Sequence, residues 1–443
     1  MRAAFYTLGC KVNQYETQIL EQLFFDNGFD IVSPDSPADL LVVNSCTVTA
    51  EGDRKTRQAL RRFKRANPSG VAALTGCFPQ AFPDIAEQIP EADVITGSRN
   101  RGSLLCAVEK YFATGRRVIE ITPHERGEEF ERMKAGRFLG RTRAFVKIQD
   151  GCDRYCSYCI IPTARGPVRS KPLEELREEL EGLAAAGYRE AVLVGINLPF
   201  YGKETGYTPR LIDAIELACA VPGIERVRLG SLEPELLTEE DIARMAAQPK
   251  FCPQFHLSLQ SGCDNTLRRM NRHYTAAEYR AIVDKLRAAF DNPAITTDII
   301  VGFPGETPEE FAQSLAFARE IGFAKVHVFP YSKREGTRAA KLPGQIPRAV
   351  KSERVAELAQ AVEPARRAFL QAQVGRTEAV LFESAAAQGG AEGYTKNYAP
   401  VRVPGAGGEL SGRVFAVEIV GVGEDCCLGR LAPNQGNPEI FSD

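Results

Sequence analysis

The sequence predicts an α/β protein in three parts: an N-terminal parallel α/β domain, a central partial (β/α) barrel and a small C-terminal all-β barrel. Two series of alternating strand and helix signals predict the first two parts. Short apolar runs between glycine-rich turns predict the third. We place the three domains at residues 1–115, 138–368 and 375–441.

Strand and helix signals alternate through the N-terminal domain, which favours a parallel sheet. The candidate strands are short apolar runs at residues 2–8, 40–43, 71–75 and 93–96. The candidate helices are amphipathic segments at residues 16–27, 51–66 and 104–113.

The central domain repeats this alternation with longer units. Its candidate strands are at residues 144–149, 191–195, 227–230, 254–259, 295–301 and 325–330. Helical patterns such as 173–186 and 276–290 lie between them. Repeated strand–helix units of this kind predict a full or partial (β/α) barrel.

The two remaining regions are a linker and the C-terminal domain. Residues 128–142 carry several basic residues and two glycines, and we expect a mobile linker there; the basic residues are Arg132, Lys134, Arg137 and Arg141. Apolar runs at 378–382, 401–403 and 414–422 predict strands of a small barrel.

Composition limits the class of protein. A hydrophobic share of 44% with 25% charged residues is typical of a globular chain. No apolar run approaches the roughly 20 residues that span a bilayer, and the first residues resemble a strand rather than a signal peptide. We therefore expect a cytoplasmic protein without a membrane partner. The net charge of −2 neither indicates nor excludes a nucleic-acid partner.

Cysteine placement carries the strongest chemical signal. Cysteines in a large cytoplasmic protein are more often metal ligands or catalytic groups than disulfides. Cys152, Cys156 and Cys159 are spaced CxxxCxxC directly after a predicted strand. Three thiolates from one loop suit an iron–sulfur cube with one open iron. The alternative is a zinc site, but His124 and His256, which could complete it, are distant in sequence.

A second set of cysteines follows three separate strands of the N-terminal domain. Cys10, Cys46 and Cys77 each come shortly after a predicted strand. The carboxyl ends of parallel strands meet at one edge of a sheet, so these thiols can converge on a second cluster. Gly9 and Gly76 precede two of them and permit close backbone approach. The alternative is three buried structural cysteines.

The other cysteines give no such pattern. We expect core positions for Cys106 and Cys219, which lie in apolar helical patterns, and structural positions for Cys252, Cys263, Cys426 and Cys427.

The first cysteine motif resembles the signature of radical S-adenosylmethionine enzymes, in which an aromatic residue precedes the third cysteine; here it is Tyr158. The resemblance implies that the open iron chelates S-adenosylmethionine and that reductive cleavage gives a 5′-deoxyadenosyl radical.

Polar residues at later strand ends are candidates for binding S-adenosylmethionine. They are Gly195, Asn197, Glu233, Gln260, Arg272 and Asp298. Gly195-Ile196-Asn197 stands where the family often has a Gly-Gly-Glu-like turn for the methionine amino group, so this chain departs from the pattern. Glu233 is a candidate for the ribose hydroxyls. The Gln–Arg–Asp series resembles the cofactor-binding set of oxygen-independent coproporphyrinogen oxidases.

The strings around Cys10, Cys46 and Cys77 are similar to those of the methylthiotransferase family, as is the order of three domains along the whole chain. The resemblance implies an N-terminal cluster domain, a radical S-adenosylmethionine domain and a C-terminal TRAM barrel. It also implies two 4Fe-4S clusters, S-adenosylmethionine, a sulfur source and a reducing electron donor. In the family one S-adenosylmethionine supplies a methyl group and a second supplies the radical.

Subgroups of the family differ in substrate. The string Gly9-Cys10-Lys11-Val12-Asn13-Gln14-Tyr15-Glu16 most resembles the group that acts on threonylcarbamoyl-adenosine in tRNA. Other groups act on isopentenyl-adenosine in tRNA or on a ribosomal-protein aspartate. The resemblance therefore implies a tRNA partner, with another tRNA adenosine or a ribosomal protein as the alternative.

Two charge patterns favour different kinds of partner. Residues 54–65 contain seven basic residues and no acid, which favours contact with phosphates. From residue 376 onward, five basic residues face nine acidic ones, and an acidic barrel suits a basic protein partner. The sequence leaves the oligomeric state open.

Overall fold

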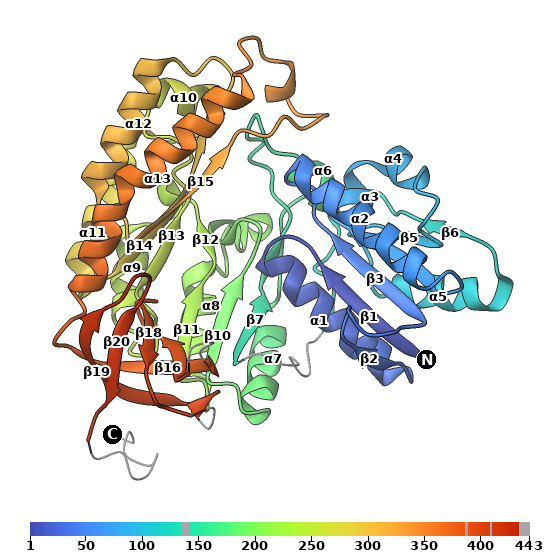
Figure 1. Cartoon of the computed structure of the whole chain (residues 1–443), viewed down its shortest axis with the longest axis horizontal. Coiled ribbons are helices and arrows are strands. Elements are labelled where there is room, and N and C mark those ends of the chain that lie inside the picture. The colour runs from blue at the N-terminus through green and yellow to red at the C-terminus, as the bar shows by residue number, and fades with distance from the viewer. Residues whose placement is uncertain (134–141, 386–388, 408–409, 434–443) are drawn as a thin grey trace.

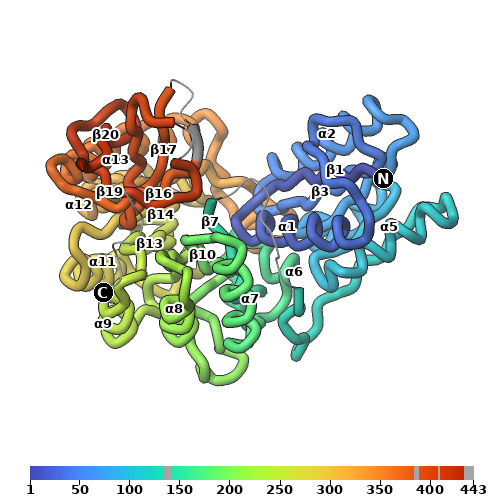
Figure 2. The backbone as a smooth tube through the Cα atoms, turned by 90° about the horizontal axis from the view of Figure 1, so that it is seen from below, coloured from blue at the N-terminus to red at the C-terminus, as the bar shows by residue number. Residues whose placement is uncertain are grey.

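The computed structural model describes residues 1–133, 142–385, 389–407 and 410–433 of the chain. The N-terminal and C-terminal domains lie on different sides of the central domain (Figures 1 and 2). Among the described helices, none is long and apolar enough to cross a membrane.

The N-terminal domain is a parallel sheet with helices on both faces. Its described strands are ordered β2-β1-β3-β4-β5-β6, and every pair is parallel. The strands are β1 (Arg2–Thr7), β2 (Asp30–Val32), β3 (Leu40–Ser45), β4 (Val71–Gly76), β5 (Val94–Thr96) and β6 (Val118–Glu120). The helices are α1 (Lys11–Asp26), α2 (Ala50–Ala66), α3 (Cys77–Ala81), α4 (Pro83–Glu87) and α5 (Ser103–Thr114).

Helix α1 begins five residues earlier than the sequence pattern predicts. Its first turn is polar in sequence, yet Val12 and Tyr15 are buried in the core of the central domain. The helix therefore packs between two domains, and α1 lies against the central strand β7 (Arg143–Lys147) in both views (Figures 1 and 2). A single-domain amphipathic pattern does not reveal such a helix start.

The central domain is an open barrel of parallel strands, as predicted. Its strands form a sheet ordered β11-β10-β7 and a second ordered β12-β13-β14-β15. They are β7, β10 (Glu190–Val194), β11 (Arg226–Leu229), β12 (Ser231–Leu232), β13 (Gln254–Leu257), β14 (Ala294–Val301) and β15 (Lys325–Pro330), with a small hairpin of β8 (Gln149–Asp150) and β9 (Arg169–Ser170).

Helices cover the outside of this barrel. They are α7 (Leu173–Ala185), α8 (Leu211–Ala220), α9 (Glu239–Ala246), α10 (Asp264–Arg269), α11 (Ala276–Ala289), α12 (Pro308–Ile321) and α13 (Arg348–Gln371). The short helix α6 (Ile161–Arg165) instead contacts α3 of the N-terminal domain. Short 3₁₀ turns are η1 (Leu198–Phe200), η2 (Lys203–Thr205), η3 (Pro234–Leu236) and η4 (Ala339–Lys341). Helices α9, α11 and α12 each begin with a threonine capping box, which satisfies free N–H groups of the first turn.

The C-terminal domain is a closed barrel ordered β16-β17-β18-β20-β19. Its strands are β16 (Thr377–Ala385), β17 (Ala391–Tyr394), β18 (Pro400–Val403), β19 (Val414–Val422) and β20 (Cys427–Leu431). Arg226 and Arg228 of β11 donate hydrogen bonds to backbone carbonyls of this barrel, at 3.1 Å to Tyr394 and 2.9 Å to Lys396. The barrel is therefore docked on the central sheet.

The predicted linker is only partly described. Arg132 pairs with Glu175 of α7 at 3.0 Å. Lys134, Arg137 and Arg141 lie outside the described residues.

Candidate active site

The three N-terminal cysteines follow three neighbouring parallel strands. Cys10 comes after β1, Cys46 after β3 and Cys77 after β4. The register pairs Thr7 with Asn44 and Ser45 with Gly76, so the three strands end at the same edge of the sheet. The thiols thus come from adjacent loops, as the sequence analysis expects.

Asn13 ties two of these loops together. Its amide nitrogen donates hydrogen bonds to the carbonyls of Leu8 at 3.0 Å and Ser45 at 2.9 Å, and its oxygen accepts one from the Cys10 thiol at 3.4 Å. Gly9 has a φ of +115°, and a Cβ there would lie 2.8 Å from the Cys46 Cβ. The glycine therefore permits the two cysteine loops to touch, a different reason from the cluster approach that we expected.

Burial favours the protonated thiols of Cys46 and Cys77. Burial raises the pKa of the Cys77 thiol to about 12, against the opposing charge of Arg165. Burial also raises the pKa of Cys46, and the charges of Cys10 and Arg165 act on it as well. Any metal that bound these thiols would have to displace their protons.

The CxxxCxxC loop follows β8 at the carboxyl end of the first barrel strand. Backbone hydrogen bonds fix the loop at two points. The Cys152 N–H donates to the Gly166 carbonyl at 3.1 Å, and the Ser157 N–H donates to the Met270 carbonyl at 2.9 Å. Burial raises the pKa of Cys152 to about 11. The loop is thus pinned at both sides while its three thiols remain free of disulfides.

Neither set of thiols is arranged for a single ion. Within the described ranges, no three His, Cys, Asp or Glu side chains converge closely enough to hold one metal ion. An iron–sulfur cube binds each cysteine at a different iron, so its ligands stand farther apart. Thiolates are the ligands that such clusters usually take.

Asn197 and Gly195 form a polar cradle beside Cys152. The Asn197 amide nitrogen lies 4.0 Å from the Cys152 sulfur, and its backbone N–H donates to Gln149 at 2.8 Å. The Asn197 side-chain oxygen is buried and accepts no hydrogen bond from any described residue. A Cβ at Gly195 would lie 2.9 Å from the Gln149 oxygen. An unsatisfied buried oxygen beside the Cys152 thiol fits a bound molecule that donates a hydrogen bond.

Glu233 and Arg272 form one ion pair beside the cysteine loop. Arg272 donates two hydrogen bonds to the Glu233 carboxylate, at 2.9 and 2.6 Å. It also donates to the Cys156 sulfur at 3.4 Å. Glu233, our candidate for ribose hydroxyls, is thus engaged in orienting an arginine that touches a cysteine.

The remaining candidates line the strands nearby. The backbone N–H of Gln260 donates to the backbone carbonyl of Asp298 at 2.9 Å, and the Asp298 carboxylate lies 3.3 Å from the His256 ring. Tyr158 packs edge-on against Phe303, with ring centroids 6.4 Å apart. The geometry gives Tyr158 a packing role.

An ion cluster joins the two cysteine domains. Glu16 of α1 is 1% exposed and pairs with Arg101 at 2.7 Å, with Lys147 at 3.0 Å and with Arg165. Burial opposes its ionisation, but the three cations outweigh burial and lower the pKa of Glu16 to about 2. Asp150 accepts from the same lysine at 2.9 Å.

Sequence reasoning missed Asn13, Gln149, Glu16 and Arg165. Asn13 and Glu16 lie among other polar residues at the start of α1, and Gln149 and Arg165 are single polar residues in short elements. For Arg165 a weak signal exists: an arginine followed by Gly166, six residues after Cys159, ends a helix of only one turn. Of the cysteines expected to be structural, Cys106 is exposed on α5, contrary to the core position predicted for it.

Two family models match the chain. The Radical SAM superfamily matches residues 146–318, and the Uncharacterized protein family UPF0004 matches residues 2–97. These matches coincide with the domains that carry the two cysteine sets.

Named relatives cover nearly the whole chain. It is 37% identical to the threonylcarbamoyladenosine tRNA methylthiotransferase MtaB of Bacillus subtilis (strain 168), over 95% of this chain and 94% of the relative. It is 36% identical to MtaB of Aquifex aeolicus (strain VF5), over 85% and 91%. It is 37% identical to the tRNA-2-methylthio-N(6)-dimethylallyladenosine synthase of Carboxydothermus hydrogenoformans, over 80% and 81%.

Among solved structures, the radical S-adenosylmethionine methyltransferase TsrM from Kitasatospora setae, with tryptophan substrate and an S-adenosylmethionine analogue bound, is similar in fold. The TM-score is 0.53 at 16% identity, over 74% of this chain and 72% of that one. Fold and cysteine loop together define a radical S-adenosylmethionine enzyme. More narrowly, the chain belongs to the methylthiotransferase family, whose cofactors are S-adenosylmethionine and two 4Fe-4S clusters.

Proposed function

We propose that this enzyme converts N6-threonylcarbamoyladenosine in tRNA to its 2-methylthio derivative. In this proposal Cys152, Cys156 and Cys159 hold the cluster that binds S-adenosylmethionine. The N-terminal thiols of Cys10, Cys46 and Cys77 hold the second cluster. The observation that carries the proposal is the direct connection of the two sites, since Arg165, six residues after Cys159, donates to the Cys77 sulfur at 3.1 Å.

The chemistry demands both sites. An aromatic C–H is too weak an acid for any side chain to deprotonate near neutral pH, because the pKa values of side-chain bases are far lower than the pKa of such a C–H group. When bound, the two clusters would supply a radical from S-adenosylmethionine and a sulfur atom. The chain's own task is to hold these groups at adjacent sites and to orient them.

Several side chains have assigned roles in this proposal. Gly195 and Asn197 bind the amino-acid end of S-adenosylmethionine, with the free Asn197 oxygen as acceptor. Glu233 holds Arg272 against Cys156. Polar side chains farther along the barrel contact the rest of the cofactor, and these are Gln260 and Asp298. Tyr158 packs behind the cluster loop.

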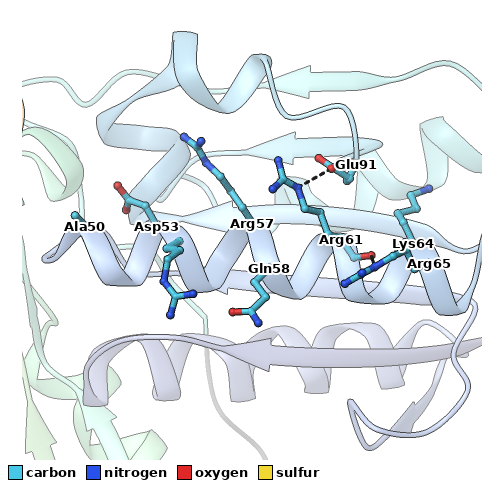
Figure 3. A pocket seen from close by; sticks show the side chains of 9 residues that line it. Ala50, Asp53, Arg57, Gln58, Arg61, Lys64, Arg65 and Glu91 are labelled. Atoms are coloured by element: carbon cyan, nitrogen blue, oxygen red, sulfur yellow. Dashed lines mark hydrogen bonds and ion pairs between the residues drawn. The ribbon is translucent and has the colours of Figure 1, made fainter.

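The tRNA partner is supported by the names of the relatives and by a basic surface on α2. A hollow of about 1000 Å³ on this helix is lined by Arg54, Arg57, Arg61, Lys64 and Arg65, with Asp53 and Glu91 as the acids. Figure 3 shows Arg57, Arg61 and Lys64 following one another along the helix. Helix α2 begins four residues after Cys46, so phosphates bound here would lie near the second cluster.

The protein-substrate alternative loses its support. Five of the nine C-terminal acids pair with arginines; the pairs are Glu378–Arg376, Glu383–Arg143, Glu392–Arg402, Glu418–Arg430 and Asp425–Arg366. These carboxylates are used within the chain, and one of them docks the barrel on β7. These five charges are therefore balanced by arginines of the same chain.

The proposal also needs a low-potential electron donor and a sulfur source as partners. Because its substrate is tRNA, we place the reaction in the cytoplasm.

The test is the nucleoside content of tRNA from cells that lack the gene. We expect loss of 2-methylthio-N6-threonylcarbamoyladenosine and accumulation of the nucleoside without the methylthio group, measured by mass spectrometry. The wild-type gene should restore the product, and a Cys77→Ala gene should not. An unchanged nucleoside profile would contradict the tRNA assignment and redirect the search to ribosomal proteins.

A further inference from the structure

Arg165 belongs to the central domain but ends inside the N-terminal cysteine site. It is the last residue of α6 and is 1% exposed. Its Nε donates to the Cys77 sulfur at 3.1 Å, and one Nη donates to the Asn13 oxygen at 2.8 Å. It also donates to the carboxylates of Glu16, at 3.0 Å for one pair of atoms, and Asp150, at 3.5 Å.

The contacts fix the guanidinium in one position. Asn13 holds the loops of Cys10 and Cys46, and Glu16 anchors α1, so Arg165 reaches all three elements that surround the second site. A guanidinium is planar and always charged, and its donors stand in a rigid fork. Lysine has no equivalent geometry at three acceptors.

We infer that Arg165 is a positioning residue of the radical domain that donates a hydrogen bond to the Cys77 sulfur and thereby raises the reduction potential of the second cluster. The inference rests on the proposed assignment of Cys77 as a ligand. Hydrogen bonds to cluster sulfurs and nearby positive charge stabilise the reduced, more negative state, and hydrogen bonding and charge are recognised determinants of such potentials. Burial strengthens the effect because the local dielectric is low.

Arg334 provides a matched control on the other side of the site. It also comes from the central domain, from the loop after β15, and it donates to Thr47 at 2.6 Å and to Asp53 at 2.8 Å. It is 5% exposed in a second contact between the same two domains, and the structure gives it no hydrogen bond to a described cysteine. Its loss tests domain docking without touching a sulfur.

The experiment measures the midpoint potential of the second cluster alone. The full chain with Cys152→Ala, Cys156→Ala and Cys159→Ala, reconstituted with iron and sulfide, keeps only that cluster. A dye-mediated redox titration followed by electron paramagnetic resonance then gives the midpoint potential of this protein and of its R165K, R165M and R334M variants. We expect a more negative potential in R165M, a smaller shift in R165K and no shift in R334M.

Each other result overturns the inference. An unchanged potential in R165M and R165K with full iron content shows that the donor does not act on the cluster. An equal shift in R334M assigns the effect to domain docking. Loss of the cluster from both R165K and R165M assigns Arg165 a purely structural role. Failure of the underlying ligand assignment is seen separately, because C77A in the same background would then retain its iron.

Discussion

At the scale of single residues, close contact between loops governs the N-terminal site. Gly9 and Asn13 bring the Cys10 and Cys46 loops together, and each does so through contacts that leave no room for a larger group. A methyl group at Gly9 would meet the Cys46 Cβ at 2.8 Å, its sulfur at 3.1 Å and the Asn13 side chain at 3.2 Å.

Gly9→Ala is therefore expected to lower the iron bound by the N-terminal site. The loops must separate to admit the methyl group, and the ligand thiols move with them. Iron content after reconstitution, in a chain that lacks the central three cysteines, measures this effect. Gly28→Ala is the control, because Gly28 also has a positive φ but no atom within 4 Å of its added Cβ. It pays only backbone strain, of about 1–2 kcal/mol. Equal iron in Gly9→Ala and wild type would contradict the close-contact explanation.

The two cysteine sets are expected to separate two activities. Cys156→Ala should abolish cleavage of S-adenosylmethionine by reduced protein, and with it every later step. Cys77→Ala should retain cleavage and lose methylthiolation, because only the sulfur-bearing site is damaged. The products 5′-deoxyadenosine and methylthiolated nucleoside, measured in the same reaction, report the two steps. Methylthiolation by either variant would contradict the two-site proposal.

The sequence was informative about these residues only where a pattern repeats. Two cysteine sets have spacing or strand positions that predict convergence, and the structure places the N-terminal three on adjacent strands. Asn13, Gln149 and Arg165 act through contacts between segments far apart in the chain. A single polar residue forms no repeating sequence pattern, so only the folded structure reveals its partner.

At the scale of elements, length decided which strands were predictable. The runs that became β3 and β4 are buried along their whole length, and β1 has a buried apolar centre, which makes all three conspicuous. The short edge strands β2 and β6 contain three residues each and have exposed positions. Such segments carry too few residues for a pattern, and their pairing depends on the neighbouring strand.

Helix α2 is an element whose charge is expected to serve binding. Arg61 and Arg65 are exposed on it and line the hollow, although Arg61 also pairs with Glu91 at 2.9 Å. The double variant Arg61→Gln, Arg65→Gln should weaken tRNA binding and reduce the slope of log affinity against log salt by about 2, roughly one for each lost phosphate contact. Filter binding at several salt concentrations measures the slope.

The control for this prediction is a double variant that removes two arginines from another part of the chain. Arg280 of α11 pairs with Glu320, and Arg319 of α12 is exposed, so their double glutamine variant also removes one paired and one exposed arginine. Both helices lie on the side of the central domain away from α2 (Figure 1). An equal loss of slope in this control would show that α2 has no special part in tRNA binding.

At the scale of the whole molecule, charged groups buried at domain contacts hold the parts together. Glu16 faces Arg101, Lys147 and Arg165, while Asp150 shares the same cations. Interfaces of this kind could not be predicted from hydrophobic periodicity, because their residues are polar in sequence and become buried only after the domains meet.

Glu16→Gln is expected to destabilise the docked N-terminal and central domains by about 3–5 kcal/mol, because it leaves buried cations without their carboxylate. The chain contains no tryptophan, so circular dichroism during urea unfolding of the metal-free protein is a suitable measurement. Glu51→Gln is the control, since Glu51 pairs with Arg54 on the exposed surface of α2. The loss of such a solvent-screened pair is expected to change the stability far less than the loss of Glu16.

The same carboxylate makes the docking sensitive to acid. The pKa of Glu16 falls from 4.5 to about 2 on folding, so its stabilisation is complete above pH 4.5 and is lost as the pH falls toward 2. Over that interval the wild-type protein should lose stability more steeply than Glu16→Gln, whose amide does not titrate. The free energy of unfolding of both proteins, measured in urea at several pH values between 5 and 3, gives the two slopes. Parallel slopes would show that Glu16 is not held ionised by its cations, and the ion cluster would then not be what locks the two cysteine domains together.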